Sequence, residues 1–145
     1  MRFWDSSALA PLILSGEPGG ELARAWLADD GAVVVWCLTR VELASAIERR
    51  AREGALTAAR RRGALRDITR LAEAAHEVID VQPVRARATA LLARHALRAA
   101  DALQLAAAQV VGDARPTAPM SFVTLDRRLA EAADREGLDV LSWPD

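Results

Sequence analysis

Near its start the chain reads Arg2-Phe3-Trp4-Asp5-Ser6-Ser7-Ala8-Leu9. A short apolar segment, expected to be a strand that ends at Asp5, passes here into a helix that reaches about Leu14. The start of a helix stabilises an anion through its unpaired N–H groups and its dipole. In an open α/β sheet, such helix starts converge on a crevice at the carboxyl ends of the strands. This junction therefore predicts an α/β fold with an acidic side chain at the crevice.

Three further acidic residues stand where a short apolar segment is expected to pass into a helix: Glu42, Asp101 and Asp126. The run before Glu42 contains Val33-Val34-Val35-Trp36, which is typical of a strand buried on both faces. With Asp5, these residues predict four carboxylates around one crevice.

The rest of the chain alternates short apolar segments with helical patterns. Strands are expected at residues 2–5, 32–36, 77–81, 121–124 and 138–141, and helices at residues 6–14, 21–28, 39–54, 57–75, from Pro83 onward, 102–111 and 126–136, with a loop at 113–119. Such alternation predicts a parallel sheet between two layers of helices. The pair of long helices at 39–54 and 57–75 is expected to form an α-hairpin inserted into this pattern. We expect a single domain over residues 1–145.

Composition narrows the classes of function. The 145 residues are 52% hydrophobic and 27% charged, with a net charge of −1, so no overall basic field favours nucleic acid. The chain contains no lysine, which excludes a P-loop and a pyridoxal Schiff base. No Cys–His cluster is available for zinc. No apolar run approaches the roughly 18 residues of a membrane span, and a cytoplasmic protein is expected.

Each of the four acids also has a purely structural interpretation. Asp5 and Asp126 suit helix N-caps, and Thr39 with Glu42 fits a capping box. Asp101 differs, because it opens a nearly all-apolar helix where a carboxylate needs a compensating partner. If the four acids meet, two like charges about 5 Å apart at an effective dielectric near 20 cost roughly 3 kcal/mol. A hard cation, Mg²⁺ or Mn²⁺, would relieve this repulsion and supports phosphoryl chemistry.

Four segments together resemble a known family. They are Trp4-Asp5-Ser6-Ser7-Ala8-Leu9, Thr39-Arg40-Val41-Glu42-Leu43-Ala44-Ser45-Ala46, Leu97-Arg98-Ala99-Ala100-Asp101-Ala102-Leu103-Gln104-Leu105-Ala106 and Phe122-Val123-Thr124-Leu125-Asp126-Arg127-Arg128-Leu129. In order and spacing the chain resembles a PIN-domain ribonuclease, specifically the VapC-like toxin of a type II toxin–antitoxin pair. This likeness covers essentially the whole chain.

The resemblance implies a PIN-like three-layer α/β/α sandwich and a Mg²⁺-dependent endoribonuclease that leaves a 5′-phosphate and a 3′-hydroxyl. It implies Asp5 and Asp101 as the principal metal ligands, with Glu42 and Asp126 completing the set directly or through water. Ser6 and Thr124 match small hydroxyl positions beside the site. A cognate antitoxin and a homodimer are implied as well.

Four arginines close in sequence to the proposed ligands are candidates for RNA phosphates, because guanidinium binds phosphate bidentately: Arg40, Arg98, Arg127 and Arg128. The predicted α-hairpin is rich in arginine too, at positions 49, 50, 52, 60, 61, 62, 66 and 70. A solvated helix face explains that cluster equally well. Whether the hairpin meets RNA or the antitoxin stays open.

Three other hypotheses remain. A non-catalytic α/β module could bind RNA or protein through the same crevice, without metal. A metal-dependent phosphatase or DNA nuclease could use the same scaffold. A metal-free ribonuclease could use His76 and His95 as acid and base; His76 is expected at a helix end.

Overall fold

The computed structural model describes residues 1–115 and 120–144, and its centre is a five-stranded sheet of order β3-β2-β1-β4-β5. The strands are β1 (Arg2–Trp4), β2 (Val33–Trp36), β3 (His76–Val78), β4 (Ser121–Val123) and β5 (Asp139–Leu141). All four pairings between them are parallel, and Phe3 of β1 lies opposite Val34 of β2 and Phe122 of β4. The predicted parallel sheet is confirmed.

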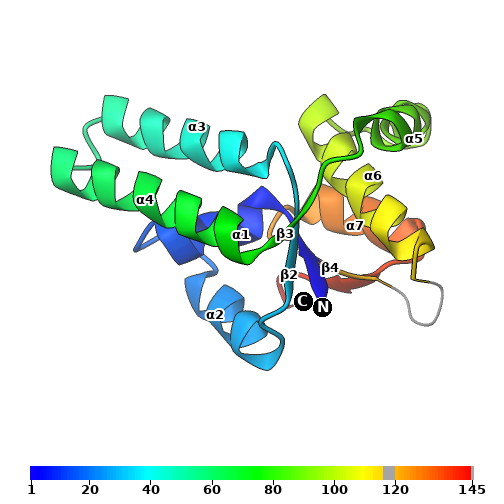
Figure 1. Ribbon diagram of the computed structural model, residues 1–145, viewed down its shortest axis with the longest axis horizontal. Helices are drawn as coiled ribbons and strands as arrows, with labels where there is room; N and C mark the ends of the chain where they lie inside the picture. Colours follow the sequence, from blue (N-terminus) through cyan, green and yellow to red (C-terminus); the bar gives the residue numbers. More distant parts are fainter. Residues whose placement is uncertain (116–119, 145) are drawn as a thin grey trace.

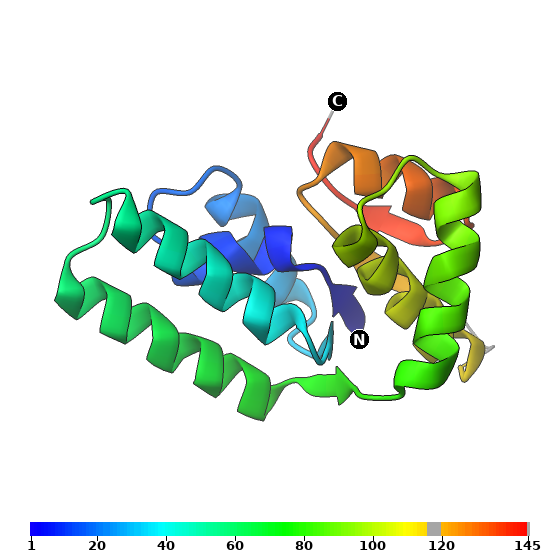
Figure 2. The ribbon, with the colours of Figure 1, turned by 90° about the horizontal axis from the view of Figure 1, so that it is seen from above.

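Helices cover both faces of the sheet. They are α1 (Ser6–Ile13), α2 (Gly20–Asp29), α3 (Thr39–Arg52), α4 (Ala58–Ala74), α5 (Val81–Arg94), α6 (Ala99–Asp113) and α7 (Arg127–Arg135). Seen from above in Figure 2, α1–α4 lie on one side of the strands and α5–α7 on the other. The three-layer α/β/α sandwich expected from the sequence is therefore confirmed.

Alternation along the strands supplies a separate core on each face. Phe3 points toward α5–α7, where its ring stacks on that of Phe122 at a centroid distance of 5.7 Å. Its neighbour Trp4 points the other way, into the core shared with α1, α3 and α4. Phe3 and Trp4 are both fully buried, and burial of each contributes about 2–3 kcal/mol. The central strand thus fixes the position of Asp5, the next residue.

The two long helices α3 and α4 pack against each other and project from the body of the protein (Figure 1). They connect β2 to β3, which are parallel neighbours in the sheet. A parallel pair requires a long crossover connection. The predicted α-hairpin is present, and it serves as that crossover.

Several predicted boundaries were wrong. The strand expected at 77–81 is β3, which ends at Val78, and Val81 already begins α5. Pro83 is the third residue of α5 and not the first, which the first turn tolerates because its N–H groups have no intrahelical partner. Helix α6 begins at Ala99 and extends through Asp113. Of the predicted loop at 113–119, residues 116–119 lie outside the described residues.

The sheet order places a topological switch between β1 and β4. From β1 the chain moves to β2 and β3 on one side, and then returns to β4 on the other side of β1. Ligands of open α/β sheets bind at the carboxyl ends of the strands at such a point. Within the described residues, no helix is long and apolar enough to span a bilayer.

Candidate functional site

Residues of the acidic quartet (Asp5, Glu42, Asp101 and Asp126) lie at the carboxyl end of the sheet or in the first turns of neighbouring helices. Asp5 directly follows β1 and caps α1, while Asp126 follows β4 and caps α7. Glu42 and Asp101 lie in the first turns of α3 and α6. The quartet therefore surrounds the switch point of the sheet.

Asp5 is held rigidly, with its side chain only 2% exposed. Its Oδ2 accepts hydrogen bonds from the Ser7 backbone N–H at 3.1 Å, from the Ser7 hydroxyl and from the Thr124 hydroxyl at 3.0 Å. Among the described residues, no hydrogen bond reaches its other oxygen, Oδ1. Burial raises the pKa of Asp5 against these hydrogen bonds, and the charge of Asp101 raises it further.

Glu42 does not form the expected capping box. Its Oε2 accepts from the Ser6 hydroxyl at 2.8 Å, and its Oε1 accepts from Gln104 Nε2 at 2.9 Å. Thr39 is the first residue of α3, and its hydroxyl pairs with Gln104, a fully buried residue of α6. Desolvation raises the pKa of Glu42, and the charges of Asp5 and Asp101 add to this effect. Glu42 is therefore directed toward the crevice by residues far away in sequence.

Asp101 and Asp126 share a cavity of about 460 Å³. Its lining consists of Arg98, Asp101, Leu125, Asp126, Arg127 and Arg128. Asp126 Oδ1 accepts from the Leu129 N–H at 2.9 Å, which is a regular N-cap contact. Asp101 does not begin its helix as expected but lies in the first turn, where burial and the charge of Asp126 raise its pKa.

Each member of the acidic quartet interacts electrostatically with at least one other member. Asp5 and Asp101 each raise the pKa of Glu42, Asp101 raises that of Asp5, and Asp126 raises that of Asp101. Within residues 1–115 and 120–144, no three histidine, cysteine or carboxyl side chains lie close enough together to hold a metal ion between them. The four carboxyls thus gather around one crevice without forming a closed cage. The metal-ligand roles of Asp5, Glu42, Asp101 and Asp126 stay predictions.

The four candidate arginines separate into two groups. Arg98, Arg127 and Arg128 line the cavity of Asp101 and Asp126, and all three are exposed. Arg40 lies elsewhere, with its Nε 3.1 Å from Glu77 Oε1. Three arginines of the α-hairpin form ion pairs with carboxylates: Arg61 with Glu48, Arg50 with Glu17 and Arg70 with Asp67. Of the four candidates, Arg98, Arg127 and Arg128 therefore lie beside Asp101 and Asp126.

Neither histidine belongs to this crevice. His76 is the first residue of β3, the edge strand, and not a helix end as expected. His95 Nε2 lies 2.6 Å from Glu136 Oε1, in a network that also includes Arg94 and Gln109. The Arg94 hydrogen bond, with those of His95 and Gln109, lowers the pKa of Glu136 to about 2. Paired imidazole catalysis has no support in this arrangement.

Two polar residues of the site were missed in the sequence. Ser7 bonds Asp5, and its hydroxyl accepts from the Leu125 N–H at 2.9 Å, so it links the ends of β1 and β4. Gln104 bonds both Thr39 and Glu42. A signal for Gln104 was present, because a glutamine amid the apolar residues of α6 needs a buried partner. Ser7 is indistinguishable from an ordinary helix-start serine.

Comparisons with known proteins agree with this architecture. The sequence model of the PIN domain family matches residues 2–135. No curated protein sequence matches the chain. Solved structures do, at low identity, and these show the same fold.

Among the similar structures is Mycobacterium tuberculosis VapC20, described as a sarcin-ricin loop cleaving toxin: it has a TM-score of 0.69 and 19% identity, over 91% of this chain and 95% of that one. A toxin–antitoxin complex from Klebsiella pneumoniae has a TM-score of 0.66 and 18% identity, over 97% and 96%. FitAcB from Neisseria gonorrhoeae has a TM-score of 0.65 and 19% identity, over 97% and 96%.

Proposed function

Since this chain belongs to the PIN domain family, we propose that it is a divalent-cation-dependent endoribonuclease and the toxin of a toxin–antitoxin pair. One observation carries the proposal: carboxyls from four separate parts of the chain repel one another at the switch point of a parallel sheet. Such concentrated negative charge is costly unless a cation compensates for it. A site of this kind is suited to phosphoryl chemistry.

The donor set fits Mg²⁺ or Mn²⁺, because the quartet offers only carboxylate oxygens. Asp5 and Asp101 would be the principal ligands, with Glu42 and Asp126 acting directly or through water. When bound, such a cation makes a coordinated water more acidic and stabilises charge on the attacked phosphate. Among the described residues the side chains do not already form a cage, so binding requires some of the four carboxyls to reorient.

Neighbouring residues of the chain hold these ligands in place. Ser7 and Thr124 fix Asp5 Oδ2 and leave Oδ1 for the cation. Ser6 and Gln104 fix the two oxygens of Glu42. Ligands oriented by surrounding hydrogen bonds bind metal more tightly than freely rotating ones.

RNA is the proposed substrate, and Arg98, Arg127 and Arg128 are its proposed phosphate contacts. These three exposed guanidinium groups stand around the cavity in which Asp101 and Asp126 lie. They give the cavity a positive rim that the net charge of −1 conceals. The scissile phosphate would thus be held against the acidic pocket.

The toxin role rests on the fold and on two similar structures, one of which is a toxin and the other a toxin–antitoxin complex. We accordingly propose an antitoxin protein as the partner, a homodimer as the assembly and the cytoplasm as the place of action. Expression of the chain alone should arrest growth, and co-expression of the cognate antitoxin should restore it.

The decisive experiment is cleavage of total RNA by the purified protein, in Mg²⁺, in Mn²⁺ and in excess chelator. We expect internal cuts with 5′-phosphate ends in either metal and none in chelator. Binding of RNA without any broken bond would favour the non-catalytic module. Faster hydrolysis of DNA or of phosphomonoesters under the same conditions would favour the other metal-dependent hydrolases, and undiminished RNA cleavage in chelator would refute the mechanism.

The cavity arginines provide a separate prediction. Arg128→Gln should weaken RNA binding by roughly tenfold or more, because a charge-assisted contact contributes about 1.5–3 kcal/mol. The dependence of the dissociation constant on salt should become shallower as one phosphate contact is lost. Fluorescence anisotropy with single-stranded RNA at several salt concentrations measures both. Arg85→Gln, an exposed arginine on α5 outside the cavity, is the matched control. Equal effects of the two variants would contradict the assignment.

A further inference from the structure

The short segment between β4 and α7 carries two residues of the site, Thr124 and Asp126. On the side of Asp5 it is fixed by Ser7, whose hydroxyl accepts from the Leu125 N–H. The Asp126 N–H in turn donates to the Thr124 hydroxyl at 3.1 Å. These contacts hold one edge of the segment to the end of β1.

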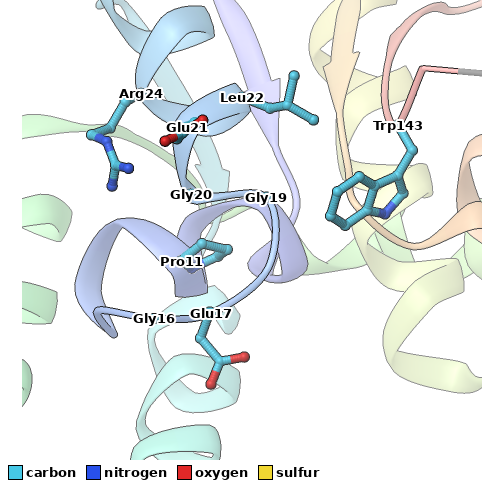
Figure 3. Close-up of a pocket in the computed structure, with 9 residues that line it drawn as sticks. All are labelled: Pro11, Gly16, Glu17, Gly19, Gly20, Glu21, Leu22, Arg24 and Trp143. Atoms are coloured by element: carbon cyan, nitrogen blue, oxygen red, sulfur yellow. The ribbon is translucent and has the colours of Figure 1, made fainter.

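The opposite edge is held by a tryptophan that follows β5. Trp143 Nε1 donates to the Leu125 carbonyl at 2.8 Å, so both backbone polar groups of Leu125 are hydrogen-bonded. Figure 3 shows the indole of Trp143 pointing toward Gly19, in the loop between α1 and α2.

The backbone of Gly19 lies against the side chains of both Leu125 and Trp143. A β carbon added at this position would overlap the Leu125 Cδ1 methyl group and lie 3.1 Å from Trp143 Cη2. The backbone at Gly19 also has a φ of +86°, which favours glycine. Leu125 is therefore clamped between Ser7, Trp143 and the bare backbone of Gly19.

We propose that Trp143 is a positioning residue, which with Gly19 holds the Leu125 peptide and so directs the carboxyl of Asp126 toward Asp101 in the shared cavity. Asp126 Oδ1 already accepts a hydrogen bond from the Leu129 N–H of α7. The direction of the Asp126 carboxyl toward α6 therefore depends on the peptide bond between Leu125 and Asp126. Trp143 holds the carbonyl group of that peptide bond. This inference rests on the proposed function, because it concerns a proposed cation ligand.

Two pairs of variants separate positioning from general stability. Trp143→Phe removes the indole N–H and keeps an aromatic ring, and Trp26→Phe, a half-buried tryptophan of α2, is its control. Gly19→Ala introduces the collision with Leu125. Its control Gly16→Ala has the same kind of backbone, with a φ of +88°, but nothing within 4 Å of the added carbon. Each pair thus shares the general cost of the substitution.

Two measurements are made on full-length protein. The first is amide hydrogen exchange at Leu125 and Asp126 in excess chelator, and the second is Mn²⁺ affinity by electron paramagnetic resonance. We expect Trp143→Phe and Gly19→Ala to accelerate exchange and to weaken Mn²⁺ binding about fivefold relative to their controls, as loss of one neutral hydrogen bond implies.

The outcomes are distinct. Accelerated exchange with unchanged Mn²⁺ affinity would overturn the positioning role, and unchanged exchange would overturn the clamp itself. If the wild-type protein binds no Mn²⁺, the proposed function fails and the role toward a cation fails with it, while the exchange rates still decide whether Trp143 holds the segment.

Discussion

Asp5→Asn should fold like the wild-type protein and lose RNA cleavage by at least about 10²- to 10³-fold, the usual effect of removing one preorganised electrostatic contact. An asparagine can place its amide oxygen where Oδ2 lies and keep the hydrogen bonds from Ser7 and Thr124. It also remains a good N-cap for α1. Its NH₂ group, however, then occupies the position of Oδ1 and presents donors to the cation. The substitution thus separates the capping role from the metal role.

Cleavage rates with saturating Mg²⁺ and thermal unfolding in chelator test this expectation. Asp67→Asn, which removes an exposed acid of α4 that pairs with Arg70 and lines no part of the cavity of Asp101 and Asp126, is the control and should cleave normally. In the metal-free state Asp5→Asn should unfold at the same temperature as the wild type or higher, because one buried negative charge is gone. A variant that unfolds readily but still cleaves RNA would show that Asp5 is only a cap.

The second large effect concerns stability, pH and metal together. Burial and mutual repulsion raise the pKa of Asp5, Glu42 and Asp101 from ordinary values of 3.8, 4.5 and 3.8. Below those values the three groups are protonated in both the folded and the unfolded chain, and they cost nothing. As pH rises, the unfolded chain ionises first, so the free energy of unfolding falls until the raised pKa values have been passed. The metal-free protein should therefore lose stability as pH rises from about 4 toward neutrality.

A divalent cation should reverse this loss. Mg²⁺ at 100 times its dissociation constant adds about 2.7 kcal/mol to the free energy of unfolding. At one fixed Mg²⁺ concentration the gain should be larger at pH 7.5 than at pH 5, because protons compete for the ligands at low pH and weaken binding. Urea unfolding at these two pH values, in Mg²⁺ and in chelator, measures the effect. Asp5→Asn should flatten the metal-free pH dependence and reduce the gain from Mg²⁺. Stabilisation by Mg²⁺ that is equal in wild type and variant would place the cation elsewhere.

The unfolding measurements should stay above about pH 5, because Glu136 contributes a separate pH dependence of stability at lower pH. Its pKa is lowered to about 2 by Arg94, His95 and Gln109, so its contribution to stability is present above its ordinary value of 4.5 and is lost as pH falls toward 2. That change has the opposite sign to the change at the crevice. The two effects are therefore separated by their pH windows.

The local pattern of apolar residues was sufficient to predict the architecture, but it was insufficient to predict where individual strands end. The β-branched run Val33-Val34-Val35-Trp36 predicted β2, whose buried residues serve both faces of the sheet. The run at 77–81 looks equally strand-like, yet β3 stops at Val78. Ile79 is 72% exposed and Val81 is 51% exposed, so hydrophobicity at these positions does not report burial. Tertiary pairing with β2, invisible in the sequence, sets the end of this strand.

The candidate site shows the same division. Acids at helix starts could be identified one by one, and the sheet order explains why Asp5 and Asp126 follow adjacent strands. The partner of Glu42 could not be identified, because Gln104 lies 62 residues further along the chain and the local capping box was the simpler explanation. Likewise, the anchoring of Leu125 by Trp143 joins two segments that share no sequence pattern. Contacts between side chains that are far apart in the sequence can be identified only from the three-dimensional structure.

The pairing of the first strand with the fourth has a consequence for the synthesis of this protein. Arg2 of β1 lies in register with Ser121 of β4, so the sheet cannot close at its centre until most of the polypeptide has left the ribosome. The ends of β1 and β4, which Asp5 and Asp126 follow, come side by side only at that moment. The nuclease proposed above would therefore lack an assembled site while it is still a nascent chain, and the proposed antitoxin would have the interval of translation in which to be made.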